Sequence, residues 1–210
     1  MRTALVLAPH PDDEAIAAFG LMRHLVRQGT AVRVVVVADG AASHPGSRRW
    51  PGRRLVAERR RETLRAMRRI GVCRGAVRFL GWPDGALDAA PPAMCRAVAR
   101  EVRRMRAPAL LVSPVVDDDH ADHRAVARAA AIRCPHVRRL GYEVWPVAQR
   151  PGPRRMLLLG LATTAAKRHT IRSYRTQAGL IDDDPAGFAM TRAQIAAFSR
   201  PVERFREIDR

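Results

Sequence analysis

The chain has 210 residues, of which 47% are hydrophobic, and it carries a formal net charge of +18. This length suits one domain with a real hydrophobic core, and no apolar run approaches the ~18 residues that a membrane-spanning helix needs. The charge comes almost entirely from arginine, which indicates the codon bias of a GC-rich genome, and the ten scattered aromatic residues do not predict a nucleic-acid-binding surface.

Apolar, β-branched runs alternate with segments of helical periodicity along the chain. In chain order, the predicted elements are a strand at 3–8, a helix at 15–28, a strand at 31–38, a helix at 53–70, a strand at 76–80, a helix at 92–106, a strand at 109–112, a helix at 122–133, strands at 141–147 and 154–161, and a helix at 163–176. This alternation predicts an α/β, Rossmann-like three-layer fold with a mostly parallel central sheet flanked by helices. No GxGxxG sequence follows the first strand, so we do not expect a dinucleotide cofactor.

We expect residues 1–210 to form a single domain, with 178–210 as a less regular C-terminal extension or lid. The chain starts with one arginine and then a strand, which is not the pattern of a signal peptide. We therefore expect a cytoplasmic protein. The sequence does not fix the oligomeric state, so a homo-oligomer stays open.

Two clusters of histidine and aspartate follow predicted strands. The first strand runs into Pro9-His10-Pro11-Asp12-Asp13-Glu14, at the edge where open α/β sheets bind ligands. The strand at 109–112 is followed by Asp117-Asp118-Asp119-His120-Ala121-Asp122-His123. Each cluster alone is typical of a turn or a solvated acidic loop. Because both stand at strand ends of one predicted sheet, together they indicate a site for a divalent metal.

A two-histidine, one-carboxylate set can be drawn from these clusters. His10, Asp13 and His123 offer the donors that hold catalytic zinc while one position stays open. His10 and Asp13 can converge across the strand-to-helix turn, and the dipole of the following helix favours an anion at Asp13. His123 reaches the same point only if the strand at 109–112 is a neighbour of the first strand.

The clusters also contain groups that a simple metal holder does not need. The turn can aim Asp12 at a water molecule on the metal, where it would act as a general base. If this segment opens a helix, His120 shares a face with His123, and it can then stabilise a developing oxyanion or protonate a leaving group. Asp122 can hydrogen-bond one of these imidazoles and set its tautomer.

The first cluster resembles the (A/P)HPDDE signature of the PIG-L/LmbE-like family of zinc-dependent N-deacetylases, and His120-Ala121-Asp122-His123 resembles its HPDH signature. Segments at 59–72, 79–85, 142–145 and 167–177 are also similar to family patterns, so the resemblance covers residues 3–178. Two positions depart from the signatures. Ala121 replaces the usual proline and Pro9 replaces the commoner alanine, and we expect only small geometric changes from either.

The resemblance implies a Rossmann-like fold, one zinc ion per chain, and removal of an acetyl group from an N-acetylated sugar or sugar conjugate. It implies that the metal ligands are His10, Asp13 and His123. It further implies that Asp12 is the general base, that His120 stabilises the oxyanion or acts as an acid, and that Asp122 is the acidic partner in the second signature.

The resemblance also places Arg59 and Asp84 where family members contact their substrates. From the residues alone, Arg59 could clamp a substrate phosphate or carboxylate, or it could be a solvated arginine. Asp84 could bind sugar hydroxyls, or it could belong to a Pro-Asp-Gly turn. The loop at 39–52 and the tail after residue 177 match no family pattern, and we expect these regions to determine specificity.

The substrate itself is not named by the sequence, although a basic chain mildly favours an anionic one. Two alternatives stay open. One is a non-catalytic or differently specific metal-binding member of the same scaffold. The other is a metal-dependent phosphoesterase, which would favour oxygen-only ligands, whereas two of the three proposed ligands are histidines.

Overall fold

The computed structural model describes residues 2–145 and 154–208. Within these residues one sheet has the strand order β3-β2-β1-β4-β5-β7-β6. The strands are β1 (Thr3–Ala8), β2 (Ala31–Ala38), β3 (Val77–Trp82), β4 (Ala109–Pro114), β5 (Val137–Tyr142), β6 (Arg154–Leu158) and β7 (Val202–Glu207). The first five strands are parallel to one another, and β7 is antiparallel to both β5 and β6. The predicted α/β fold with a mostly parallel sheet is therefore confirmed.

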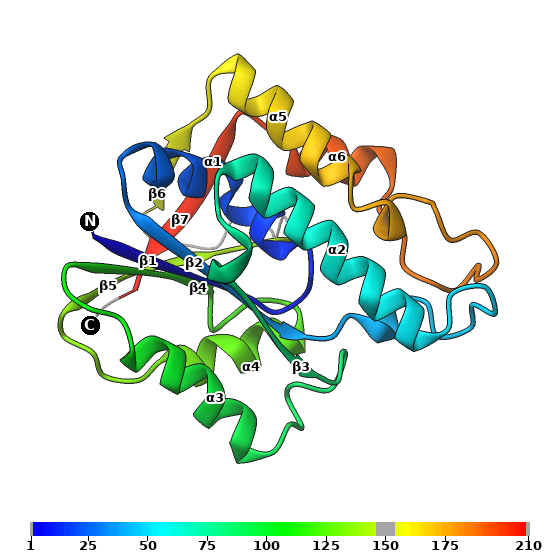
Figure 1. Ribbon diagram of the computed structural model, residues 1–210, viewed down its shortest axis with the longest axis horizontal. Helices are drawn as coiled ribbons and strands as arrows, with labels where there is room; N and C mark the ends of the chain where they lie inside the picture. Colours follow the sequence, from blue (N-terminus) through cyan, green and yellow to red (C-terminus); the bar gives the residue numbers. More distant parts are fainter. Residues whose placement is uncertain (1, 146–153, 209–210) are drawn as a thin grey trace.

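Helices cover both faces of the sheet (Figure 1). One face carries α1 (Asp13–Arg27), α2 (Gly52–Ile70), α5 (Leu161–Arg172) and α6 (Arg192–Phe198), and the other carries α3 (Pro92–Arg103) and α4 (Ala121–Ala130). Short 3₁₀ turns are η1 (Ala41–Ser43), η2 (Arg74–Ala76) and η3 (Arg175–Gln177). Among the described residues, no helix combines the length and apolar character needed to span a bilayer.

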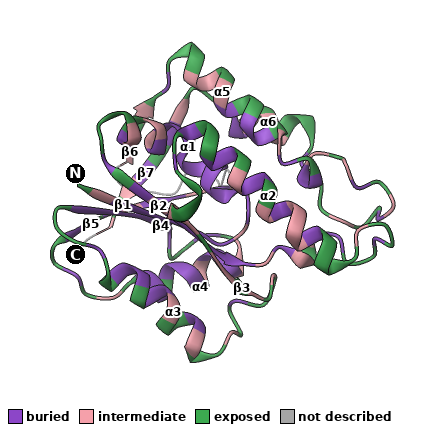
Figure 2. Cartoon of the chain, viewed as in Figure 1, coloured by how far each residue is buried: buried purple, intermediate pink, exposed green. Residues whose placement is uncertain are grey.

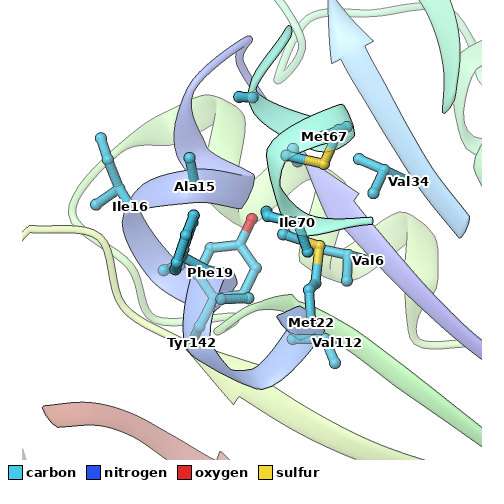
Figure 3. Close-up of a cluster of buried hydrophobic side chains, with 14 of the residues drawn as sticks. Val6, Ala15, Ile16, Phe19, Met22, Val34, Met67, Ile70, Val112 and Tyr142 are labelled. Carbon is cyan, nitrogen blue, oxygen red and sulfur yellow. The ribbon is translucent and has the colours of Figure 1, made fainter. Parts of the chain in front are cut away.

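The central strands are buried on both faces, as parallel strands between two helical layers must be. Val6 of β1 packs beneath α1 and α2 with Phe19 and Met67, whereas Leu5 and Leu7 belong to the core under α3 and α4. Figure 3 shows the first of these cores, in which Tyr142 lies beside Phe19. Buried residues accordingly occupy the sheet and the helix faces turned toward it in Figure 2.

The order of the strands positions the functional edge. Strand β1 lies between β2 and β4, and it pairs with Ala31 and with Ala109 through the same residue, Thr3. The chain runs outward from β1 in one direction through β2 and β3, and in the other direction through β4 and β5. Ligands bind at such a switch point, beyond the carboxyl ends of the strands. The condition placed on His123 is met, because β4 is a neighbour of β1.

Helix α1 is interrupted in its middle, where Ala18 has the non-helical angles φ −135° and ψ 19°. The carboxylate of Glu203, from β7, accepts the backbone N–H groups of Gly20 and Leu21 at 2.8 and 2.9 Å. Lys167 of α5 donates to the same carboxylate at 2.8 Å, and both charged side chains are buried. A charged pair from two later elements therefore satisfies the backbone of the second half of α1.

The predicted fifth strand at 141–147 is wrong in position. Strand β5 begins four residues earlier, at Val137, and residues 146 and 147 lie outside the described residues. Two arginines within β5 obscured its apolar pattern. One of them, Arg139, is buried and donates to the carbonyl groups of Ala130, the last residue of α4, and of Ile132.

The tail after residue 177 contains a strand that the sequence did not predict. Strand β7 enters the sheet between β5 and β6, so part of this tail belongs to the central layer. Its sequence VERFRE has two apolar residues among four charged ones, a composition typical of polar surface. Phe205 is nevertheless buried in the core with Tyr142.

Candidate metal centre and active site

The carboxyl ends of β1 and β4 bring together the three residues expected to bind a metal. Asp13 Oδ2 lies 3.2 Å from His10 Nδ1 and 3.3 Å from His123 Nε2. The same oxygen accepts the backbone N–H of His10 at 2.8 Å, which fixes the turn between them. The potential ligand atoms of all three residues lie within 4.8 Å of one another. Segments more than a hundred residues apart thus place two imidazoles and one carboxylate around one point.

A carboxylate to which the sequence assigned no role lies behind His123. Asp118 Oδ2 is 3.3 Å from His123 Nδ1, and both side chains are only 1% exposed. Within the described residues, neither atom makes a hydrogen bond of regular geometry. The other oxygen of Asp118 accepts the backbone N–H of His120 at 2.9 Å. A carboxylate at this nitrogen leaves Nε2 free for a metal, the common arrangement behind metal-binding histidines.

The donor set fits zinc, since two imidazole nitrogens and one carboxylate oxygen leave a fourth position for water or substrate. Burial alone would lower the pKa of both imidazoles, but the neighbouring carboxylates outweigh it. Asp122, Asp13 and Asp84 raise the pKa of His10 well above its usual value. Asp13 and Asp118 raise the pKa of His123 to about 9. In the metal-free protein, protons therefore occupy positions that a cation would take.

The second ring nitrogen of His10 faces two more carboxylates. His10 Nε2 lies 3.1 Å from Asp122 Oδ2 and 3.2 Å from Asp84 Oδ1. Asp122 also accepts the backbone N–H groups of Gly85 and Leu87, each at 2.9 Å. Among the site imidazoles, the carboxylate of Asp122 thus contacts His10. This contact holds the ring so that Nδ1 faces Asp13.

His120 lies at the N-terminus of α4 and beside the other two imidazoles. Its ring centroid is 4.7 Å from that of His10 and 5.0 Å from that of His123. His120 Nδ1 accepts the backbone N–H of Asp122 at 3.2 Å, so in the neutral ring the proton lies on Nε2. Burial, followed by repulsion from His10 and His123, lowers the pKa of His120. The ring is thus a neutral N–H donor.

Asp12 is buried beside the proposed ligands and lines the same cavity. Burial raises the pKa of its carboxyl group to about 8, although the positive charge of Arg59 works against the shift. The pKa of Asp13 moves the other way, because His123 and His10 outweigh the effect of burial and lower it. Adjacent carboxyl groups whose pKa values move in opposite directions are suited to different tasks.

The backbone at Asp12 is held in an unusual conformation. Among the described residues, Asp12 is the one non-glycine residue with positive φ, at 142°. Its N–H donates to Glu14 Oε2 at 3.1 Å, and Tyr174 donates its hydroxyl hydrogen to the other oxygen of Glu14. On the other side of the peptide, the carbonyl of Pro11 accepts from Arg59 Nη2 at 2.8 Å. Two buried charged side chains therefore hold the Pro11–Asp12 peptide group.

Arg59 is not the solvated side chain that its helix suggests, since it is 2% exposed. Besides Pro11, it donates to the carbonyl of Gly40 at 3.0 Å, and its Nη2 lies 3.5 Å from Asp12 Oδ2. Asp84 follows β3, and its second oxygen accepts the backbone N–H of Ala42 at 3.0 Å. Both residues line the cavity next to the proposed ligands.

A cavity of about 250 Å³ opens beside the three proposed ligands. Its lining includes Ala42 and Ser43 from the loop after β2, Gln177 from η3, and Phe188, Met190 and Phe198 from the tail. The two regions without family patterns therefore both reach the cavity. Val144 and Trp145, which follow β5, also line it.

A family model described as PIG-L, GlcNAc-PI de-N-acetylase, matches residues 5–133. A curated relative, the 2'-N-acetylparomamine deacetylase of Streptomyces fradiae, is 33% identical over 138 residues, which cover 58% of this chain and 48% of the relative. The chain thus spans about half the length of that relative.

Solved structures with the same fold include the N,N'-diacetylchitobiose deacetylase from Pyrococcus horikoshii, at a TM-score of 0.67 and 20% identity, over 85% of this chain and 72% of that one. They also include GalB, the 4-carboxy-2-hydroxymuconate hydratase from Pseudomonas putida, at a TM-score of 0.64 and 18% identity, over 95% of this chain and 83% of that one. A deacetylase and a hydratase share the architecture, so the fold alone does not select the reaction.

Proposed function

The chain belongs to the PIG-L family, and from that premise we propose that it is a zinc-dependent hydrolase that removes an acetyl group from an N-acetylated amino sugar or sugar conjugate. The observation that carries the proposal is the convergence of His10, Asp13 and His123 beside a cavity that also contains Asp12 and His120. A metal holder without chemistry would need neither of the last two.

His10 Nδ1, Asp13 Oδ2 and His123 Nε2 would hold one zinc ion per chain. When bound, zinc supplies a Lewis acid that polarises the amide carbonyl and lowers the pKa of water. Asp122 and Asp118 orient the two imidazoles from behind, which supports the affinity of the site.

Asp12 is the proposed general base. It takes a proton from the attacking water, and its raised pKa suits a base that works near neutral pH. Water adds to the amide carbon, and the carbonyl oxygen becomes an oxyanion. His120, through Nε2–H, donates a hydrogen bond to this oxyanion. Transfer of the proton that Asp12 took from water to the departing nitrogen then releases the free amine and acetate.

We assign different tasks to the two residues expected to contact substrate. Asp84 lies at the cavity and keeps lone pairs that could accept from sugar hydroxyls. Arg59 is engaged with two backbone carbonyls and with Asp12, so we propose that it positions the base.

An acetate-release screen with metal analysis tests the proposal. Zinc-loaded protein should bind one zinc per chain and release acetate from at least one N-acetylglucosaminyl compound, and Asp12→Asn should keep the zinc and lose the release. A protein that binds zinc and releases no acetate would instead support a differently specific member of the scaffold. The control is needed because a hydratase shares this fold, so a different reaction on the same scaffold is a real alternative.

A further inference from the structure

The cavity has two chemically different halves. The polar half consists of the proposed ligands and of Asp12, Ser43, Arg59, Asp84, His120 and Gln177. The other half is an apolar wall, made of Ile16, Val144, Trp145, Phe188, Met190 and Phe198. Apart from the indole N–H of Trp145, no side chain in this wall can donate or accept a regular hydrogen bond. A wall of this kind does not recognise sugar hydroxyls.

Trp145 stands at the centre of the wall. Its ring centroid lies 5.9 Å from that of Phe188 and 5.6 Å from that of Phe198, and both pairs are edge-to-face. Phe198 is 7% exposed, whereas Phe188 leaves 36% of its surface exposed. The aromatic cluster thus continues from the buried core to the rim of the cavity. An accessible aromatic surface of this kind, beside a catalytic cavity, is suited to burying an apolar part of a ligand.

Backbone hydrogen bonds fix the segment that supplies Phe188 and Met190. The N–H of Phe188 donates to the carbonyl of Ser43, and that of Met190 donates to the carbonyl of Gln177, each at 2.7 Å. Asp184, from the same segment, accepts the N–H of Gly46 at 2.8 Å. The apolar wall is therefore formed before a ligand arrives, which lowers the entropic cost of binding.

Most of the wall comes from outside the part of the chain that matches the family. Ile16 lies within residues 5–133, but the other five residues follow that range. The ligands and the general base come from the matched region. The apolar wall thus comes mostly from segments that follow the matched region.

We propose that the substrate carries an apolar group, aliphatic or aromatic, on the amino sugar next to the scissile amide, and that the apolar wall binds this group. The proposal rests on the proposed deacetylase function, because it concerns the same cavity. The apolar group has two possible sources: an aglycone on the sugar, or an N-acyl chain longer than acetyl. Both present the same chemistry to the wall.

Two substrate series distinguish these sources. One series varies the aglycone of N-acetylglucosamine through methyl, butyl, hexyl and phenyl glycosides. The other varies the acyl group of glucosamine through acetyl, butanoyl and hexanoyl. We expect kcat/KM to rise at least about tenfold along one series, mainly through KM, because apolar burial adds binding with each methylene. Flat values along both series would overturn the proposal.

Single-residue variants test whether the apolar wall causes the preference for longer alkyl groups. Phe188→Ala removes a partly exposed ring, and we expect it to reduce the ratio of kcat/KM between the hexyl and methyl members at least about fivefold. Leu161→Ala is the matched control, since this apolar side chain is 91% exposed and does not line the cavity. The control should keep the wild-type ratio. An unchanged ratio in Phe188→Ala would count against the wall.

Binding without chemistry separates the subsite from the reaction. Calorimetry should detect tighter binding of hexyl β-glucoside than of methyl β-glucoside to the wild-type protein, and the difference should shrink in Phe188→Ala. If this holds while no substrate releases acetate, the subsite stands and the proposed reaction fails. If all members of both series are deacylated at equal rates and neither glucoside binds, the reaction stands and the subsite is overturned.

Discussion

The carboxylate of Glu14 accepts the backbone N–H of Asp12, only two residues earlier, and thereby holds the proposed base in a left-handed backbone conformation. Such conformations cost about 1–3 kcal/mol for residues other than glycine, and they persist only where their surroundings impose them. Here the contact of Glu14 with Tyr174 and that of Arg59 with Pro11 hold the backbone of Asp12 in this conformation.

Glu14→Ala should lower kcat at least about tenfold, with zinc content unchanged, because the peptide can relax and withdraw the base. Steady-state kinetics and metal analysis measure both quantities. Tyr174→Phe should show a smaller loss, since Glu14 keeps its bond to Asp12. Glu58→Ala, which removes a carboxylate on the surface of α2, serves as the control. Full activity in Glu14→Ala would exclude a positioning role.

Arg59→Lys should lower kcat while KM changes little. A lysine cannot donate to Pro11 and Gly40 and pair with Asp12 at the same time. The measurement compares neutral and anionic substrates. A rise in KM confined to anionic substrates would show instead that Arg59 contacts the substrate.

Asp12→Ala should keep zinc and lose activity by about 10²–10⁴-fold, the usual contribution of a general base. His123→Ala should lose zinc instead, because it removes one of three ligands. Metal analysis after dialysis, together with acetate release, distinguishes the two variants. Wild-type turnover in Asp12→Ala would refute the assignment of the base.

Zinc binding should weaken as pH falls. The pKa of His10 is raised and that of His123 is about 9 in the metal-free protein, so both rings carry protons at neutral pH. Zinc binds neutral imidazole, so these protons are released, and apparent affinity should fall by up to about 100-fold per pH unit below about pH 8. Calorimetry in buffers of different ionisation enthalpy counts the protons. Affinity independent of pH would contradict the assigned ligands.

Glu203→Ala should destabilise the fold by about 3–5 kcal/mol, the range for removing one partner of a buried ion pair. It leaves the charge of Lys167 and the N–H groups of Gly20 and Leu21 without the carboxylate. Urea unfolding measures the loss. Glu207→Ala, which disrupts surface ion pairs on the same strand, should cost no more than about 1 kcal/mol.

The sequence predicts those parts of the molecule whose physics is local. Strands β1 and β2 match their predicted ranges, because their apolar runs are uninterrupted. The convergence of His10, Asp13 and His123 follows from the position of their motifs at strand ends. Strand β5 was misplaced because it contains two arginines, and sequence pattern cannot show that one of them, Arg139, is buried against carbonyl groups at the end of α4.

Parts of the site depend on contacts between segments that are far apart in the chain. Asp118 becomes a partner of His123 only when its loop is buried, and Arg59 turns inward only because the carbonyls of Pro11 and Gly40 lie within reach. Trp145 faces a cavity because residues of the tail form its opposite side. None of these relationships leaves a local signature.

The dependence of α1 on Glu203 bears on how the site can be transplanted. The helix that begins with Asp13 is completed by a carboxylate 183 residues after Gly20. Chimeras that exchange only residues 5–133 between relatives would carry every proposed ligand and the base, yet the donor helix would arrive without its partner strand. Recombination boundaries therefore belong beyond β7 or must import a matching carboxylate.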